Sequence, residues 1–431
     1  MDVHFYCGAA RRDITPAEAE VSGLFGLMGT PYAGIIDRLS VRVIAMQSKE
    51  EKALIVSFDL DKAPEPATWL PQLAAHTGIA QERILYFGTH THSAPVTTIR
   101  PREKHPVKDE RRANMNRYEA VLYEKMIACA DEAIGAMEPA QLGFASGKSF
   151  VNVNRNANFV FTDENGKKFP FIAEAMNWGA AVDPTLFTMR VEDRNGKPIA
   201  FFINYALHCC MMFLNNYDGK GAMGISGDVA GRVSSLVEEK YPDAVAVWSS
   251  GAAGDVDPIL FNALMYPEPK DGHYVKESFD SWKISEMQLR MIVGWHYKDV
   301  IETLEKVDCN QENIDIRSSL EWSETPSNTE EPYRIRMQAL QLGDVALVGI
   351  GGELYSSLGK VIREASPIKH TVIINHNASL VEDAGYILDD DAICRASSDA
   401  PTPHFVPGGK TRAKLGEVAP SLETHIRCML S

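Results

Sequence analysis

The feature that most constrains the fold is a buried strand that runs directly into two closely spaced histidines. The apolar, β-prone run Ile84–Phe87 leads into the polar segment Gly88–Pro95, which reads GTHTHSAP. This pattern predicts a buried strand ending in a polar turn, and α/β proteins place their chemistry at such strand ends. His90 and His92 are two residues apart, so on an extended backbone they share one face. Such a pair can bind one metal ion, or act as one ligand and one proton-transfer group; two solvated loop histidines are an equally good interpretation of the pair alone.

Further strands end in the same way. His208 follows the strand expected at Ile199–Leu207, and Glu353 follows the strand expected at Val345–Ile350. Asp383 lies beyond a later expected strand. Taken alone, each has a structural interpretation, such as a core histidine or an acidic residue at a helix N-terminus. Their shared position at strand ends favours a metal site, since histidine and carboxylate ligands hold catalytic zinc while leaving room for water.

The order of the expected elements indicates an α/β fold. A strand at Ala53–Asp59, a helix at Pro64–His76 and the strand Ile84–Phe87 form a strand–helix–strand unit with a parallel crossover. Met115–Met137 has the apolar periodicity of a core-packing helix. No repeat, low-complexity tract or linker divides the 431 residues. We therefore predict a mixed β-sheet core flanked by helices, in a single large catalytic domain.

Other segments are expected to lie at the surface. Asn152–Asn156 is interpreted as a polar turn, and the Pro-, Gly- and charge-rich stretch Phe261–Lys283 as an inserted loop. Ile314–Trp322 and Tyr333–Leu340 alternate like exposed antiparallel strands. The insert and the loop Arg100–Arg112 leave motif-bearing strands, so we expect both to border the mouth of the site and to narrow it.

Composition excludes several classes of partner. With 43 basic and 58 acidic residues the formal net charge is −15, which argues against nucleic acid and anionic membrane surfaces. No run approaches the length of a transmembrane helix, so no stable membrane insertion is expected. The seven cysteines are scattered, which favours reduced thiols. Without a secretory signal, unless one has been removed, we predict a cytoplasmic protein acting on a small-molecule substrate; its oligomeric state stays open.

Nine segments, in order along the chain, resemble the catalytic N-terminal domain of the neutral/alkaline (non-lysosomal) ceramidase family. They are Gly8–Thr15 (GAARRDIT), Val56–Leu60 (VSFDL), Gly88–Pro95 (GTHTHSAP), Asn152–Arg155 (NVNR), Asn204–His208 (NYALH), Ser226–Gly231 (SGDVAG), Gly254–Pro258 (GDVDP), Gly352–Leu354 (GEL) and Gly385–Tyr386 (GY). The most specific are the THTHS-x-P motif and the combination of N-x-x-x-H with S-G-D. Residues 1–431 are thus interpreted as one such domain, without the C-terminal immunoglobulin-like domain of the larger members.

The resemblance implies a zinc amidohydrolase that cleaves an N-acyl bond. It places the metal ligands of the family on His90, His208 and Glu353. The fourth metal ligand of the family is a late tyrosine, which aligns with Asp383; this part of the alignment is anchored only by Gly385–Tyr386. Aspartate is itself a competent zinc ligand. One ion, Zn²⁺, is expected, with manganese and iron as alternatives.

The same resemblance assigns active-site roles to His92 and Arg155. His92 is predicted to transfer protons, and Arg155 to bind a substrate oxygen. Asp257 stands where the family carries a serine in its G-D-x-S-P motif, and it is predicted to orient the water or His92 instead of forming an acyl-enzyme. We therefore expect a metal-activated water to cleave an amide or related bond in a substrate smaller and more polar than ceramide. A metal-dependent lyase and a catalytically silent metal-binding protein are the alternatives.

Overall fold

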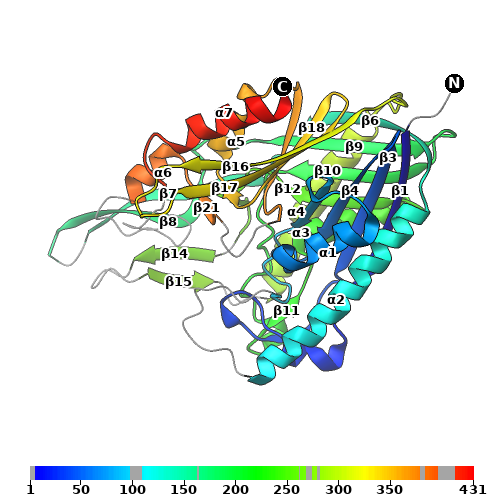
Figure 1. Cartoon of the computed structure of the whole chain (residues 1–431). Helices are drawn as coiled ribbons and strands as arrows, with labels where there is room; N and C mark the ends of the chain where they lie inside the picture. The colour runs from blue at the N-terminus through cyan, green and yellow to red at the C-terminus, as the bar shows by residue number, and fades with distance from the viewer. Residues whose placement is uncertain are drawn as a thin grey trace.

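The chain folds into four stacked layers. The structure is a computed structural model that describes residues 5–97, 109–162, 165–261, 263–267, 274–278, 282–378, 384–396 and 413–431. Helices cover one face of an eight-stranded sheet, a four-stranded sheet packs on its other face, and further helices cover the outside of that second sheet (Figure 1). The predicted α/β fold with a mixed sheet flanked by helices in one domain is confirmed. That the core consists of two sheets was not foreseen.

The large sheet is mixed. In order across the sheet its strands are β12 (Val245–Ser250), β10 (Pro198–Tyr205), β9 (Thr185–Asp193), β6 (Glu138–Lys148), β1 (Phe5–Asp13), β3 (Ser40–Ser48), β4 (Glu51–Phe58) and β5 (Ile84–Gly88). The pairs β4–β5 and β10–β12 are parallel, and β1, β3 and β4 pair antiparallel. The expected parallel crossover from β4 to β5 is therefore present.

Helices α1 to α4 cover one face of this sheet (Figure 1). They are α1 (Pro66–Thr77), α2 (Asp109–Gly135), α3 (Asp228–Lys240) and α4 (Trp282–Leu304). Along β3, Val41 and Val43 belong to the core beneath these helices, whereas Ile44 and Met46 belong to the core between the two sheets. The alternation follows from the period of two along a strand, and it explains why β3 is apolar on both faces.

The second sheet is smaller. Its strands are β16 (Ile316–Thr325), β17 (Tyr333–Leu342), β18 (Val345–Ile350) and β20 (His370–Ile374). Its outer face packs on α5 (Ser356–Ala365) and α7 (Val418–Leu430), and a short helix α6 (Asp390–Ala396) contributes to the same core. The expected antiparallel pairing of β16 with β17 is confirmed. The expected exposure of β17 is wrong, because the strand has apolar cores on both faces.

The remaining strands form smaller sheets. They are β13 (Val256–Pro258), β7 (Asn152–Thr162), β8 (Lys168–Asn177), β14 (Ala263–Pro267) and β15 (Tyr274–Ser278) in one sheet, β2 (Tyr32–Ile35) with β11 (Met223–Ile225), and β19 (Glu353–Leu354) with β21 (Tyr386–Ile387). Within the described parts of the presumed loop Phe261–Lys283, β14 and β15 pair antiparallel, so the interpretation as irregular loop is corrected.

The polar segment Asn152–Asn156 is also not a turn. It begins β7, which pairs with β13 and β8. The amide nitrogen of Asn152 donates to the carbonyls of Asp183 and Ala206, at 2.9 Å each. These distant partners satisfy an amide side chain that usually favours a turn, so tertiary contacts override the local preference.

Both sheets bring the ends of their parallel strands to one place. The backbone N–H of Asn375, just after β20, donates to the carbonyl of Ser250 at the end of β12, at 2.9 Å. Asn377 forms a bridge with Phe87 at the end of β5, and its side-chain oxygen accepts from the N–H of Tyr86 at 2.9 Å. The N–H of His92 donates to the carbonyl of Cys209, and the N–H of His376 donates to that of Gly352, so the loops that follow β5, β10, β18 and β20 converge.

Candidate metal centre

Three of the predicted metal ligands meet where these loops converge. The Nε2 atoms of His90 and His208 lie 3.5 and 3.4 Å from Oε2 of Glu353. Donor atoms around a tetrahedral zinc, with bonds of ~2.0–2.1 Å, are separated by ~3.3–3.4 Å. The separation between each of the two histidine nitrogens and the carboxylate oxygen thus matches that between neighbouring donor atoms in such a coordination shell.

The outward nitrogen of each of these rings is tied to an oxygen. Nδ1 of His90 lies 2.9 Å from Oδ1 of Asp61 and 3.0 Å from its carbonyl oxygen, and Nδ1 of His208 lies 3.1 Å from the carbonyl of Val256. A carbonyl oxygen only accepts, so Nδ1 carries the proton in both rings. Each Nε2 is thereby directed toward Glu353, and an outward Nδ1 hydrogen bond of this kind is how proteins orient histidine ligands toward a metal.

The Thr-His-Thr-His segment is fixed by its backbone and by its threonines. The N–H of His90 donates to the carbonyl of Leu60 at 3.0 Å, and the residue has a left-handed backbone with φ of +63°. The hydroxyl of Thr91 donates to the carbonyl of Ser226 at 2.8 Å, and the N–H of His92 donates to that of Cys209 at 2.9 Å. The anchored threonine turns away from the cluster, which leaves ring nitrogens of both histidines within 4.8 Å of each other.

The electrostatics of the cluster favour a cation. Burial alone would lower the pKa of His90, but the carboxylates of Glu353 and Asp61 raise it to about 9. Burial lowers the pKa of His208, and the charge of Arg155 lowers it further. Although burial opposes ionisation of Glu353, the charge of His90 and hydrogen bonds from both rings hold its pKa well below the usual range. The donor set therefore suits a divalent ion, whose charge two nearby carboxylates can balance.

His92 also faces the cluster. Its Nε2 lies 3.2 Å from Nε2 of His90, and its Nδ1 has no hydrogen-bond partner in the described part of the chain. Burial lowers its pKa well below the ordinary value, and the neighbouring His90 and His208 act in the same direction. His92 therefore lies close to the predicted ligand His90, at a distance that would also allow it to act as a ligand.

Arg155 and Asp257 lie on the other side of His208. Arg155 is only 2% exposed, and its Nη2 donates to the carbonyl of Gly254 at 2.7 Å and lies 3.4 Å from Nε2 of His208. Asp257 contacts Nη1 of Arg155 at 3.1 Å and the thiol of Cys210 at 3.7 Å. Among the residues that the structure describes, no hydrogen bond joins Asp257 to His92. Its carboxylate contacts Arg155, and its predicted role in orienting the water stays a prediction.

Two residues that the sequence reasoning did not assign lie at the same cluster. Tyr386 pairs with Glu353 through β19 and β21, and burial, the charge of Glu353 and a hydrogen bond with Glu353 raise its pKa well above the usual value. Tyr386 was used only to anchor the alignment, and Asp383, the residue predicted there, lies outside the described residues. His376 stacks on His90 with ring centroids 3.7 Å apart. Its position just after β20 repeats the strand-end signal and could have found it.

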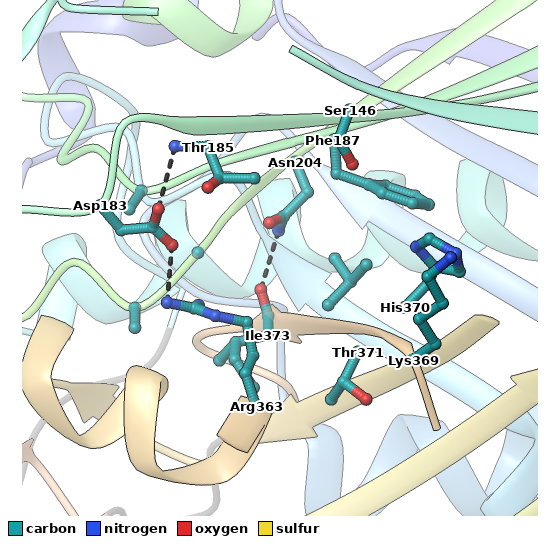
Figure 2. Close-up of a pocket in the computed structure, with 14 residues that line it drawn as sticks. Ser146, Asp183, Thr185, Phe187, Asn204, Arg363, Lys369, His370, Thr371 and Ile373 are labelled. Atoms are coloured by element: carbon teal, nitrogen blue, oxygen red, sulfur yellow. Dashed lines mark hydrogen bonds and ion pairs between the residues drawn. The ribbon is translucent and has the colours of Figure 1, made fainter. Parts of the chain in front are cut away.

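A separate cavity of about 160 Å³ lies between the end of the large sheet and α5 (Figure 2). Within it, Asp183 forms an ion pair with Arg363 at 2.7 Å, and the amide of Asn204 donates to the carbonyl of Ile373 at 2.8 Å (Figure 2). None of the predicted site residues within the described part of the chain lines this cavity. The convergent histidines and Glu353, not this cavity, thus form the candidate site.

Comparison with known proteins agrees with this geometry. A family model described as neutral/alkaline non-lysosomal ceramidase, N-terminal, matches residues 5–271. The chain therefore belongs to the neutral/alkaline non-lysosomal ceramidase family, and the resemblance predicted from the motifs is confirmed. The matched segment contains His90, His92, Arg155, His208 and Asp257; Glu353 lies beyond it.

Individual relatives extend the comparison. Neutral ceramidase B of Dictyostelium discoideum is 26% identical over 291 residues, which are 60% of this chain and 36% of that protein. The chain thus spans little more than a third of the length of this curated relative. The crystal structure of neutral ceramidase from Pseudomonas aeruginosa aligns with a TM-score of 0.68 over 99% of this chain and 74% of that chain, at 16% identity. A ceramidase structure complexed with C2 gives the same values. These alignments show a shared fold that includes β18 to β21.

Proposed function

We propose that this chain is a metal-dependent hydrolase that cleaves an amide, or N-acyl, bond with one zinc ion. The observation that carries the proposal is the spacing of the donor atoms of His90, His208 and Glu353, together with the fixed Nδ1 protons of both rings. When bound there, a zinc ion would lower the pKa of a water molecule and polarise a carbonyl group. Family membership supports the amide bond, because the named relatives are ceramidases.

A fourth protein ligand is proposed from β21. Tyr386 is the better supported choice, because its side chain is hydrogen bonded to Glu353 and its backbone pairs with Glu353 in β19–β21. Its phenol oxygen would be the ligand atom. Tyrosine is also the residue type that the family resemblance implies. Asp383, three residues earlier, stays the alternative. Replacing Tyr386 by Phe and Asp383 by Asn separates the two, because only loss of a ligand weakens metal binding.

His92, Arg155 and Asp257 are proposed to serve the reaction itself. Nδ1 of His92, which has no hydrogen-bond partner among the described residues, can take up a proton and pass it to the leaving amine. The guanidinium of Arg155 reaches the cluster beside His208 and would stabilise negative charge on the substrate oxygen. Asp257 is a positioning residue, since it holds Nη1 of Arg155 and so fixes the direction in which Nη2 donates.

The substrate is proposed to be smaller and more polar than ceramide. Asp257 places a carboxylate where the resemblance expects a hydroxyl, and Glu174 lies 3.7 Å from the same guanidinium. Two carboxylates beside one arginine give this part of the site a net negative charge. Such a wall favours a polar or cationic amine over a long apolar chain.

The decisive experiment measures metal content. Purified chain should contain about one tightly bound ion, and His208→Ala should lose most of it, because the ion loses a neutral nitrogen ligand. His425→Ala, on α7, is the matched control and should retain the ion. Full metal occupancy in His208→Ala would refute the ligand assignment. A panel of amides, esters and a long-chain ceramide then identifies the reaction, and bound metal without any turnover would favour a silent binding protein.

The site also supports proposals about organisation and location. Its residues come from positions 90 to 386, so we propose that the whole chain forms one catalytic unit. None of the helices in the described part of the chain is both long and apolar enough to cross a membrane. All seven cysteines are free thiols, which supports a reducing compartment such as the cytoplasm.

A further inference from the structure

His376 occupies a position that is costly without a ligand. Its side chain is 0% exposed, and neither ring nitrogen has a hydrogen-bond partner among the described residues. Buried polar groups in proteins are nearly always hydrogen bonded, and an exception calls for an explanation. The residue also has a left-handed backbone, with φ of +63°, a conformation that residues other than glycine seldom adopt. Both features are typical of functional sites.

The ring is held where it is by the backbone on both sides. The N–H of His376 donates to the carbonyl of Gly352 at 3.1 Å, and the N–H of Asn377 donates to that of Ile350 at 2.9 Å. These contacts fix the residue against the loop that carries Glu353. One nitrogen of His376, one of His90 and a carboxylate oxygen of Glu353 all lie within 4.8 Å of one another.

The orientation of the ring excludes a shared ion with His90. The rings of His90 and His376 are stacked, with centroids 3.7 Å apart and planes inclined by 18°. The lone pair of an imidazole nitrogen lies in the plane of its ring, so a bound ion lies in or near that plane. Two nearly parallel planes at this separation do not contain the same ion. An ion bound by His376 therefore lies beside an ion bound by His90.

We propose that His376 and Glu353 bind a second divalent cation, so that the cluster is a two-metal site. The separation of the stacked rings agrees with the ~3.5–4 Å between the ions of known two-metal sites. The carboxylate of Glu353 has two oxygens that can each accept a ligand bond, so it can serve both ions. The inference adds to the proposed function and rests on it only for the first ion.

The second site should be the weaker one. It has fewer protein ligands than the first, and Lys62 lies close enough for its positive charge to act on His376. Water molecules would complete the coordination, as they do in most sites with few protein ligands. The two ions should therefore bind in separate steps.

The test is a titration of metal-free full-length chain with Mn²⁺, followed by calorimetry and electron paramagnetic resonance. Wild-type chain should bind about two ions, and the second should produce the spin-coupled signal of a close pair. His376→Phe keeps a stacked aromatic ring but no nitrogen, and should bind about one ion without that signal. His370→Phe makes the same change at the start of β20, away from the cluster, and should behave as wild type.

The outcomes separate the two proposals. One ion in both wild type and His376→Phe would overturn the second site while leaving the proposed hydrolase site intact. Two coupled ions in His376→Phe would also overturn it, because another residue would then supply the ligand. No bound ion in wild-type chain would refute the first site itself. A circular dichroism spectrum identical to that of wild type shows that the variant is folded.

Discussion

Two fully buried histidines in this molecule have opposite surroundings. His296 on α4 is 0% exposed; its Nε2 accepts from the indole N–H of Trp248 at 3.1 Å, and its Nδ1 donates to the hydroxyl of Ser149 at 3.1 Å. His376 is equally buried, but neither nitrogen has a partner among the described residues. A satisfied buried imidazole contributes to the fold, whereas an unsatisfied one beside other ligands indicates a site that binds something.

The same contrast separates two buried arginines. Arg42 on β3 donates to Asp59 at 2.7 Å and to Glu238 at 2.8 Å, within the core beneath the helices. Arg155 is oriented by Asp257 but extends one amino group toward His208. Arg42 thus links strand and helix, whereas Arg155 directs charge into the cluster. Burial alone does not distinguish structural from functional polar residues; the direction of their contacts does.

The largest expected effect concerns catalysis at the cluster. His92→Ala should lower kcat by about 10²–10⁴-fold on a hydrolysed amide, the usual loss for a general acid or base. It should leave the bound metal in place, as measured by elemental analysis of the same sample. His370→Ala, outside the cluster, should leave kcat unchanged. If His92→Ala loses the metal, its 3.2 Å approach to His90 reflects a ligand and the proton-transfer role is wrong.

The next effect concerns stability at the satisfied histidine. His296→Phe should lower the free energy of unfolding by about 3 kcal/mol, because the indole N–H of Trp248 and the hydroxyl of Ser149 lose their partner while buried. Urea denaturation followed by tryptophan fluorescence measures the change. Metal content and kcat per folded molecule should stay as in wild type. An unaltered unfolding midpoint would show that the two hydrogen bonds contribute little.

The pH dependence of stability gives a third measurement on His296. Burial lowers its pKa to about 3, against ~6.5 in an unfolded chain, so below pH 6.5 the unfolded chain binds a proton that the folded chain does not. Its contribution to stability is complete above pH 6.5 and falls by ~1.4 kcal/mol per pH unit toward pH 3.

Other buried groups must be subtracted from this profile. Burial raises the pKa of Asp228 and Asp255 to about 6. Below pH 6 the folded chain therefore binds protons at these carboxyls more tightly than the unfolded chain does, which raises the free energy of unfolding as the pH falls. The difference in unfolding free energy between wild type and His296→Gln removes their contribution, since glutamine does not titrate. That difference should shrink steadily as the pH is lowered from 6.5. A difference independent of pH would contradict the assignment of a neutral imidazole.

Much of this architecture could be predicted from the sequence, because strands, helices and their ends leave local signals in it. The apolar run before His90 predicts β5, and Gly78, with φ of +70°, ends α1 near the expected residue. The strand-end rule also located His208 and Glu353, because the end of a strand is visible in the chain itself. The rule does not predict which strand ends lie next to one another in the folded protein. That depends on the packing of two sheets, whose facing surfaces both appear simply as apolar residues.

The same limit explains what the sequence reasoning missed. Asn152 and Asn154 favour a turn locally, and only partners far along the chain place them in β7. His376 follows an expected strand as His208 does, yet nothing in the chain shows that its nitrogens lack hydrogen bonds. Tyr386 reaches Glu353 through the pairing of β19 with β21, two strands too short to leave a periodic signal.

The smallest expected effect completes the comparison of the two histidines. In metal-free chain, His376→Phe should change the free energy of unfolding by less than about 0.5 kcal/mol, or raise it, because no hydrogen bond is lost and a buried, unsatisfied polar ring is replaced by an apolar one. The stack on His90 is kept, and the left-handed backbone adds only a small cost, because histidine tolerates it somewhat better than phenylalanine does. With saturating Mn²⁺, however, wild-type chain should gain more stability than the variant, since only the wild type binds the second ion. Thermal melts with and without the metal measure both quantities. A loss of stability in metal-free His376→Phe comparable to that of His296→Phe would mean that His376 is a structural residue after all, and that its nitrogens have partners in the folded protein.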